Sequence, residues 1–480
     1  CLFNSLNKPA EVEEDKPFTF TDQTVISGVD VTGMTLDQAK QALQKDVKKL
    51  NKPLEISINL DGQTKKLTQD NFTYTYNIPQ VVQQAYNDAM NPEKKVSKDE
   101  VRKYDFIIEK NSKDDTNHNV IVIADPQISE RSELADLAKQ SEDMAEFVGG
   151  MDGDYTFGIC LGDIVGWDHS IYPEYNRIMS KAGIDYRYVI GNHDMTNWGR
   201  SYETSMKNYG DMYGPAWYSF NVGNVHYIVM NDNFYVGRDY FYIGYIDERQ
   251  LQWLERDLSY VAPGSRVVVS MHIQTTNDKS DRDAFQYGII GDNLCNKPAF
   301  YAMLEPYKTT ILSGHSHTAD FEQISENIFE MNIAGFCGAW WCGEVCIDGA
   351  PAGYKVLDMD GDDMKWIYKG CFHPLDYQMK VYTGLEGYPG MVVANIWDYD
   401  PEWKVEYFED GVKVCDMERF KAQDPLAAEL YKDPSSLKRS WVYAAPTENM
   451  FRASVSADAK VLEVRATDRF GRVYSKVIEK

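Results

Sequence analysis

Apolar runs of strand length alternate with helical patterns through the middle of the chain. Residues 120–124 form a continuous apolar run, which is typical of a strand buried on both faces. The same pattern predicts further strands at 155–161, 186–190, 225–230, 267–270 and 310–312. Between the strands, apolar residues recur with a helical period at 132–147 and 247–260. Strands that alternate with helices predict an α/β domain.

A different pattern precedes this region. A polar linker at 1–20 is followed by a short strand at 25–31 and a helix that Thr35 caps. A strand is predicted at 54–58, and a second helix begins near Pro79. Residues 106–108 have the pattern of an edge strand inside a polar connector. We therefore predict a small α+β module at 21–110.

The C-terminal part has an all-β pattern. Residues 354–368 alternate as in a hairpin and close the α/β domain, which we place at 118–372. From 376 to 480, short strands are separated by turns, and Asp410-Gly411 is the best hairpin signal. This spacing predicts an immunoglobulin-like β-sandwich at 376–480.

Composition narrows the possible partners. The 480 residues are enough for two to four domains. A formal charge of −25 and a pI near 4.7 argue against a protein that coats nucleic acid, which needs a basic face. An acidic surface also repels anionic substrates unless the site itself carries positive charge, which bound divalent metal ions supply. We expect a monomer that acts on a small substrate.

The eight cysteines help to predict the cellular compartment of the protein. Cys1 followed by a polar linker is the pattern of a lipid-modified bacterial surface protein, although a trimmed chain gives the same start. We expect an extracytoplasmic protein that meets the membrane only through this anchor. Cys337, Cys342 and Cys346 cluster, but a zinc site needs a fourth ligand, so we expect buried or singly bridged cysteines.

Five short polar blocks each follow an apolar, β-rich run. The blocks are Asp125-Pro126-Gln127, Gly162-Asp163, Gly191-Asn192-His193-Asp194, Met271-His272 and Gly314-His315-Ser316-His317. Their side chains offer oxygen and imidazole nitrogen, a mixture that suits Mn, Fe, Zn, Co or Ni. Any one block is common in loops, and a histidine at a strand end is more often structural. Five blocks in this arrangement predict a metal centre at the ends of the strands.

In this order the blocks resemble the signature of the calcineurin-like metallophosphoesterase superfamily: D-x-H, G-D, G-N-H-[DE], a lone His and G-H-x-H. The resemblance implies a four-layer α/β/β/α sandwich and a phosphoester hydrolase with two divalent metal ions and a bridging hydroxide. It assigns the first ion to Asp125, Gln127, Asp163 and His317. It assigns the second ion to Asp163, Asn192, His272 and His315.

The resemblance also implies roles beside the ions. His193 would stabilise charge on the phosphoryl group or protonate the leaving oxygen, and Asp194 would hold His193 or its loop. One residue departs from the pattern, because Gln127 stands where the family usually has histidine. A neutral amide binds transition metals more weakly than imidazole does, so the first site would be looser or would prefer a harder ion.

The sequence indicates substrate-binding residues less clearly than it indicates metal ligands. Trp340 and Trp341 could form a stacking wall for a ring, although paired tryptophans equally well cover a core. His169 could face the site, or it could be a solvated loop residue. Monoesterase, phosphodiesterase and nucleotide pyrophosphatase remain alternatives, because the same metal pair serves all of them.

The N-terminal module carries a second resemblance. Residues 28–39 are similar to the opening of peptidoglycan-binding-like domains of bacterial surface proteins, which implies contact with the cell wall. A spacer without a ligand is the alternative. A rival interpretation of the whole chain follows: a wall-binding surface protein in which the phosphoesterase fold is a non-catalytic scaffold.

Overall fold

The chain divides into two units, Cys1–Glu109 and Lys110–Lys480. The structure is a computed structural model that describes residues 19–20, 23–50, 55–60, 63–68, 81–82, 85, 102–104, 115–151, 155–196, 201–236, 242–275 and 291–480. The predicted anchor at Cys1, its linker up to residue 18 and the edge strand at 106–108 lie outside the described residues, whereas Phe20, at the end of the predicted linker, is buried. None of the helices in these ranges is long and apolar enough to cross a membrane.

The first unit contains the predicted strands near residues 25–31 and 54–58 and the helix after Thr35, and the described residues 81–82 and 85 of the second predicted helix are helical. The expected single strand at 25–31 is a pair, β1 (Thr24–Ile26) and β2 (Val29–Asp30), and β5 (Arg102–Tyr104) pairs with β1 on its other side. Helix α1 (Leu36–Leu50) begins after Thr35, which exchanges hydrogen bonds with Gln38 as in a capping box. Strands β3 (Glu55–Leu60) and β4 (Gln63–Thr68) form a hairpin.

Two sheets form the centre of the second unit. One has the order β18 (Asp363–Gly370), β17 (Gly353–Asp360), β6 (Asn117–Ile123), β7 (Tyr155–Cys160) and β8 (Tyr186–Tyr188). The other has the order β15 (Asp320–Gln323), β16 (Ile328–Asn332), β14 (Lys308–Ser313), β13 (Arg266–Ser270), β10 (Val225–Val229) and β9 (Tyr218–Val222). Strands β6, β7 and β8 are parallel to one another, as are β10, β13, β14 and β16.

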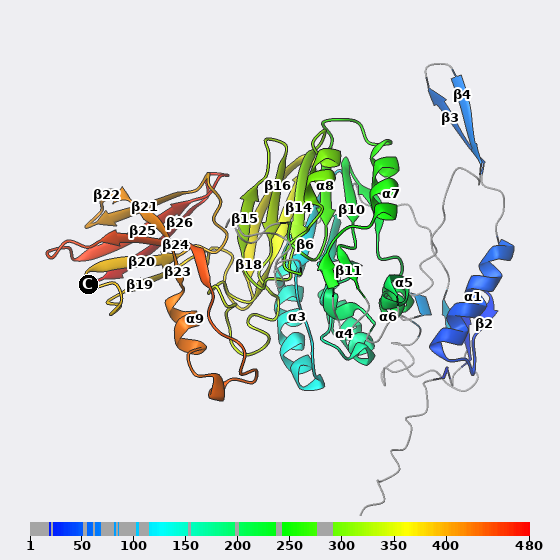
Figure 1. Ribbon diagram of the computed structural model, residues 1–480, viewed down its shortest axis with the longest axis horizontal. Coiled ribbons are helices and arrows are strands. Elements are labelled where there is room, and N and C mark those ends of the chain that lie inside the picture. The colour runs from blue at the N-terminus through cyan, green and yellow to red at the C-terminus, as the bar shows by residue number, and fades with distance from the viewer. Residues whose placement is uncertain are drawn as a thin grey trace, which may run out of the picture. The chain divides into compact units, whose positions relative to one another are not determined.

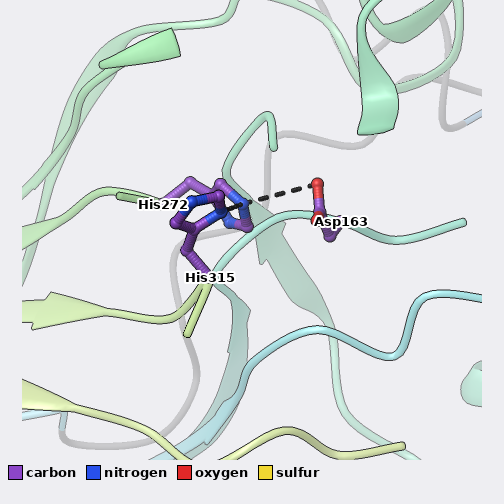
Figure 2. A group of neighbouring side chains, drawn as sticks. All are labelled: Asp163, His272 and His315. Carbon is purple, nitrogen blue, oxygen red and sulfur yellow. Dashed lines mark hydrogen bonds and ion pairs between the residues drawn. The ribbon is translucent and has the colours of Figure 1, made fainter. Parts of the chain in front are cut away.

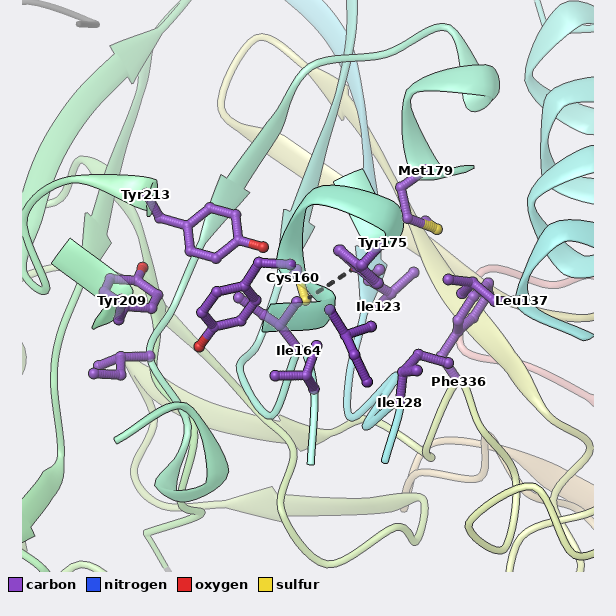
Figure 3. Packing of buried hydrophobic residues seen from close by; sticks show 14 of the residues in the cluster. Ile123, Ile128, Leu137, Cys160, Ile164, Tyr175, Met179, Tyr209, Tyr213 and Phe336 are labelled. Atoms are coloured by element: carbon purple, nitrogen blue, oxygen red, sulfur yellow. Dashed lines mark hydrogen bonds between the residues drawn. The ribbon is translucent and has the colours of Figure 1, made fainter. Parts of the chain in front are cut away.

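Alternate residues of β6 explain the continuous apolar run. Val120 and Val122 face the second sheet and share a core with Tyr227 and Val268, whereas Ile121 and Ile123 face outward. The outward residues pack under α3 (Leu134–Gly149) and α4 (Tyr172–Met179), as Figure 3 shows in part. On the far side, α7 (Glu248–Leu258) and α8 (Lys297–Leu304) cover the six-stranded sheet. The predicted α/β/β/α layering is therefore confirmed.

The last hundred residues form the predicted β-sandwich, which Figure 1 shows in colours that run from yellow through orange to red. One sheet contains β19 (Lys380–Thr383), β20 (Met391–Asn395), β24 (Pro446–Ser454) and β23 (Glu418–Gln423). The other contains β22 (Val412–Asp416), β21 (Lys404–Glu409), β25 (Val461–Thr467) and β26 (Val473–Glu479). The Asp410-Gly411 turn joins β21 to β22, with a positive φ at both residues, which a tight hairpin turn needs.

Smaller elements lie in the connections. They are β11 (Asn233–Tyr235), β12 (Tyr242–Gly244), α5 (Tyr202–Ser205), α6 (Lys207–Tyr213), α9 (Pro425–Leu430) and 3-10 turns at Arg131–Glu133, His169–Ile171, Ser180–Ala182, Asn192–Asp194 and Pro434–Ser436. The cysteines of the described ranges are free thiols, with Cys337 and Cys346 buried and Cys342 half-buried.

Candidate metal centre

The five polar blocks meet because of strand direction. Asp125 follows β6, Asp163 follows β7, and Asn192 follows β8 in one sheet. His272 follows β13, and His315 follows β14 in the other. Since these strands are parallel within each sheet, their carboxyl ends meet at one edge, where α/β folds place their sites.

Asp163 and two histidines form the tightest group of this edge (Figure 2). The ligand atoms of Asp163, His272 and His315 all lie within 4.8 Å of one another. His272 Nε2 is 3.4 Å from Asp163 Oδ1 and 3.1 Å from His315 Nδ1. Asn192 Oδ1 lies 3.0 Å from the same His272 nitrogen. The four residues assigned to the second ion therefore surround one point.

The residues assigned to the first ion lie on the other side of Asp163. His317 Nε2 is 3.7 Å from Asp125 Oδ1, and Gln127 Nε2 donates to Asp163 Oδ2 at 3.2 Å. The two oxygens of Asp163 thus face different partners: Oδ1 faces His272, and Oδ2 faces Gln127. A carboxylate shared by two ions can present its two oxygens in this way.

Two buried acceptors in this group have no hydrogen-bond partner. They are Asp125 Oδ1 and Gln127 Oε1, and both residues are almost fully buried. An unpaired buried acceptor costs about 1–3 kcal/mol, and more when it is charged, so native proteins avoid it. A divalent cation would satisfy both oxygens. The residues present therefore fit a metal ion.

The backbone around the site is held in an uncommon conformation. Five of the predicted metal-binding residues have a positive φ: Asp125 (49°), Gln127 (37°), Asp163 (49°), His315 (70°) and His317 (54°). Each such residue costs on the order of 1 kcal/mol or more and persists only where the surrounding structure imposes it. This clustering of strain at one edge of two sheets marks a functional site.

Glycines allow the loops to approach one another closely. A Cβ at Gly191 would lie 2.2 Å from Asp163 Oδ1, and a Cβ at Gly314 would lie 2.6 Å from Asp125 Oδ2. No side chain fits in either place. The glycines that precede Asn192 and His315 are therefore required by contact with carboxylates of other loops.

Burial and the charges of neighbouring groups shift the pKa values of Asp125 and His272. Burial raises the pKa of Asp125 to about 8. Burial lowers the pKa of His272, but the charge of Asp163 and their hydrogen bond outweigh it and raise that pKa to about 10. Asp125 therefore needs a nearby positive charge to stay ionised, which is the electrostatic setting of a cation site.

A hydrogen bond orients His272, and a carboxylate lies near His315. His272 Nδ1 lies 2.8 Å from the carbonyl oxygen of Leu161, to which it donates, so Nε2 is left to face Asp163. His315 Nε2 lies 3.9 Å from Asp292 Oδ1. Sequence reasoning missed Asp292, because it follows no predicted strand and belongs to no block.

Two family matches cover this region and the sandwich. The family "Calcineurin-like phosphoesterase" matches residues 118–319, and "C terminal of Calcineurin-like phosphoesterase" matches residues 330–474. The chain belongs to the calcineurin-like phosphoesterases. It is a phosphoester hydrolase of a family that uses divalent metal ions. Both matches begin after the N-terminal unit, so its resemblance to peptidoglycan-binding-like domains stays a prediction.

Solved structures similar to this phosphoesterase include two phosphatases and a nucleotidase. A dimetal phosphatase from Danio rerio is 15% identical over 53% of this chain and 96% of its own, with a TM-score of 0.39. A purple acid phosphatase from yellow lupin is 12% identical over 53% of this chain and 52% of its own, with a TM-score of 0.39. A 5'-nucleotidase from Candida albicans is 12% identical over 52% and 50%, with a TM-score of 0.32. No curated protein matches the chain. The family assignment rests on the two domain matches.

His193 of this phosphoesterase stands beside the metal-binding group. Its Nε2 lies 4.0 Å from Asp163 Oδ2, and its buried Nδ1 has no hydrogen-bond partner. Its backbone N–H donates to Asp163 Oδ1 at 2.8 Å, which fixes the loop. The ring of Trp167 lies 3.9 Å from the His193 ring, centroid to centroid. Trp167 was not predicted, although it is the aromatic residue nearest to the Gly-Asp block.

Asp194 and His169 hold the loop of His193. Asp194 is fully buried and accepts hydrogen bonds from the backbone of Gly191 and Ile164 and from the Tyr172 hydroxyl. His169 Nε2 lies 2.9 Å from the carbonyl oxygen of His193, and its Nδ1 lies 3.0 Å from Asn208 Nδ2. Both ring nitrogens of His169 are thereby engaged by the protein, so its contacts are those of a positioning residue.

The side chains of Trp340 and Trp341 contact different parts of the fold. Trp340 stacks on His317 with centroids 3.9 Å apart and an interplanar angle of 24°. Trp341 donates from Nε1 to the carbonyl oxygen of Pro126 at 3.0 Å and packs on the core under α3. Both residues have a positive φ, which is rare for bulky side chains. Of the predicted stacking pair, Trp340 lies at the site, whereas Trp341 packs.

Proposed function

We propose that this phosphoesterase hydrolyses small phosphoesters at a centre of two divalent metal ions, with His193 beside the reacting phosphoryl group. The observation that carries the proposal is the pair of unpaired buried oxygens, Asp125 Oδ1 and Gln127 Oε1, next to the group of Asp163, His272 and His315. Together these side chains offer two neighbouring sets of ligands that share one carboxylate. That arrangement supports two ions rather than one.

The residues divide the work of hydrolysis. When bound, two ions would activate a water molecule and neutralise charge on the phosphoryl oxygens. Asp163 would hold both ions at a fixed separation, and Asn192 would add a neutral oxygen to the second set. His193 would donate a hydrogen bond to the phosphoryl group or a proton to the leaving oxygen, a contribution of about 10²–10⁴-fold in rate. His169 and Asp194 would keep its loop in place.

The metal is proposed by ligand type. The histidines and carboxylates suit Mn, Fe, Zn, Co or Ni. The first set contains one histidine, one carboxylate of its own and the amide of Gln127, so it is poorer in nitrogen than the second. We therefore propose that the first ion is the harder one, such as Mn.

The test is a metal and substrate survey of the full chain. Dialysed protein loaded with Mn²⁺ is expected to hold about two ions per chain and to hydrolyse members of a panel of phosphomonoesters, phosphodiesters and nucleotides. Asp163→Asn is expected to lose both metal and activity, whereas His193→Ala keeps the metal and loses turnover. A protein that binds no metal and cleaves none of the panel would favour the rival, a non-catalytic wall-binding scaffold. The panel also decides between monoesterase, phosphodiesterase and nucleotide pyrophosphatase.

A further inference from the structure

Exposed indole rings stand on two sides of the metal centre. Trp167 is 42% exposed and lies against His193. Trp441 is 56% exposed and meets Trp340 edge-on, with centroids 4.7 Å apart and an interplanar angle of 72°. Trp340 in turn covers His317. Large apolar rings are therefore left open to solvent beside the residues that would hold the substrate's phosphoryl group.

Trp441 comes from the C-terminal match, on a loop that is firmly anchored. The Arg439 guanidinium donates to the carbonyl oxygen of Trp340 and lies 2.5 Å from Glu133 Oε1. Glu133 is fully buried at the start of α3, and Lys438 Nζ lies 2.9 Å from the same oxygen. An ion pair at a buried carboxylate fixes a loop far better than an exposed pair does. Trp441 is therefore exposed to solvent although ion pairs hold its loop in place.

Direct contacts connect Arg439 with Trp340 and Trp340 with Trp441. Arg439 holds the backbone of Trp340, and Trp441, two residues later, holds its ring. Trp340 itself depends on a left-handed backbone to reach His317. Several independent contacts thus keep one ring over a metal-binding histidine and a second ring beside it in solvent. Packing alone does not require the second ring, because more than half of its surface contacts no protein.

We propose that Trp167, Trp340 and Trp441 form an aromatic mouth that selects phosphoesters carrying a planar ring close to the phosphorus. The inference rests on the proposed function, because it places the phosphoryl group at the metal centre. Aryl groups and nucleobases share the flat π-face that indole stacks on, whereas alkyl groups lack it. The C-terminal domain therefore takes part in substrate selection through Trp441.

The experiment compares ring-bearing with ring-free compounds on the full, Mn²⁺-loaded chain. Binding is measured with phenylphosphonate and methylphosphonate, which the enzyme cannot hydrolyse. Turnover is measured with phenyl phosphate, a nucleoside monophosphate and glycerol phosphate. Trp441→Ala is expected to lower the ring-bearing to ring-free ratio about tenfold, both in affinity and in kcat/KM, which corresponds to about 1.4 kcal/mol. If Trp441→Ala lowers kcat/KM more for phenyl phosphate than for the nucleotide, the site recognises aryl groups. If the loss is larger for the nucleotide, the site recognises nucleobases.

Matched variants separate stacking from folding. Trp441→Phe keeps an aromatic face and is expected to retain most of the ratio, whereas Trp441→Leu keeps the apolar contact with Trp340 and loses the ratio. Tyr443→Ala removes an aromatic residue that is 69% exposed on the same loop and is expected to leave the ratio unchanged.

Two outcomes would overturn the aromatic mouth. One is a wild-type chain without preference for phenylphosphonate; the other is a ratio that Trp441→Ala and Trp441→Leu leave unchanged. A wild-type chain that prefers phenylphosphonate but cleaves no ester would support the mouth and contradict the proposed function.

Discussion

Gly191→Ala tests whether the close approach of two loops holds the metal centre together. The new Cβ would lie 2.2 Å from Asp163 Oδ1 and 2.1 Å from the backbone nitrogen of Asp163. To reach an ordinary contact of 3.4 Å with that oxygen, the loops must separate by about 1.2 Å. The φ of Gly191 is −99°, which alanine adopts freely, so the effect comes from contact and not from backbone strain.

The expected loss follows from this displacement. The two loops carry Asp163 on one side and Asn192 with His193 on the other, so separating them moves the histidine from the shared carboxylate. A misplacement of about 1 Å in an active site costs roughly 100-fold, or about 2.7 kcal/mol of transition-state stabilisation. We expect Gly191→Ala to lower kcat/KM by about this factor and to weaken metal retention.

The assay measures metal content, thermal unfolding and kcat/KM on one substrate for matched variants. Gly210→Ala is the control, because a Cβ at this helical glycine of α6 meets nothing within 4 Å. Alanine there should be neutral or stabilising by up to about 1 kcal/mol. Full metal content and activity within a few-fold of wild type in Gly191→Ala would refute the reasoning that the loop contact sets the geometry.

Three further predictions concern single contacts. Gln127→His replaces an amide oxygen by imidazole and should raise the affinity for Zn²⁺ relative to Mn²⁺ in a competition titration; an unchanged preference would mean that residue 127 is not a ligand. His169→Phe removes the hydrogen bond to the His193 carbonyl, so kcat should fall roughly fivefold at unchanged metal content, since one hydrogen bond contributes about 1 kcal/mol; lost metal would contradict a positioning role. Lys355→Met leaves buried Asp398 without its ion partner and should lower the free energy of unfolding by about 3–5 kcal/mol, which added Asp398→Leu should largely restore in urea unfolding.

The sequence predicts which polar side chains meet at the ends of the strands, because their signal is local. Each of Asp125, Asp163, His272 and His315 follows an apolar strand, and parallel strands bring their ends together without further information. The strand near residue 120 was also predicted from a local signal. Its two faces meet two different cores, so its residues form one continuous apolar run. Short edge strands such as β9 and β15 were missed, because their half-buried residues give no strong period.

The surroundings of the metal centre could not be predicted in the same way. Trp340 and Trp341 are neighbours in the chain and both have a positive φ, yet one ring stacks on His317 while the other packs on the core. Trp441 lies about a hundred residues further on and reaches the site through Arg439 and its buried partner. Such convergence depends on tertiary contacts, which no sequence period encodes.

The C-terminal match is also part of the catalytic fold. The first family match ends at residue 319, before β16, β17 and β18. Yet β16 pairs with β14 in one sheet, and β17 pairs with β6 in the other. A chain cut at 319 would therefore leave two strands with open edges, and these are the strands that carry Asp125 and His315 at their ends. The residues after 319 thus complete both sheets, cover His317 with Trp340 and place Trp441 beside Trp340. The two matched regions therefore form one enzyme and not a catalytic domain with an appendage.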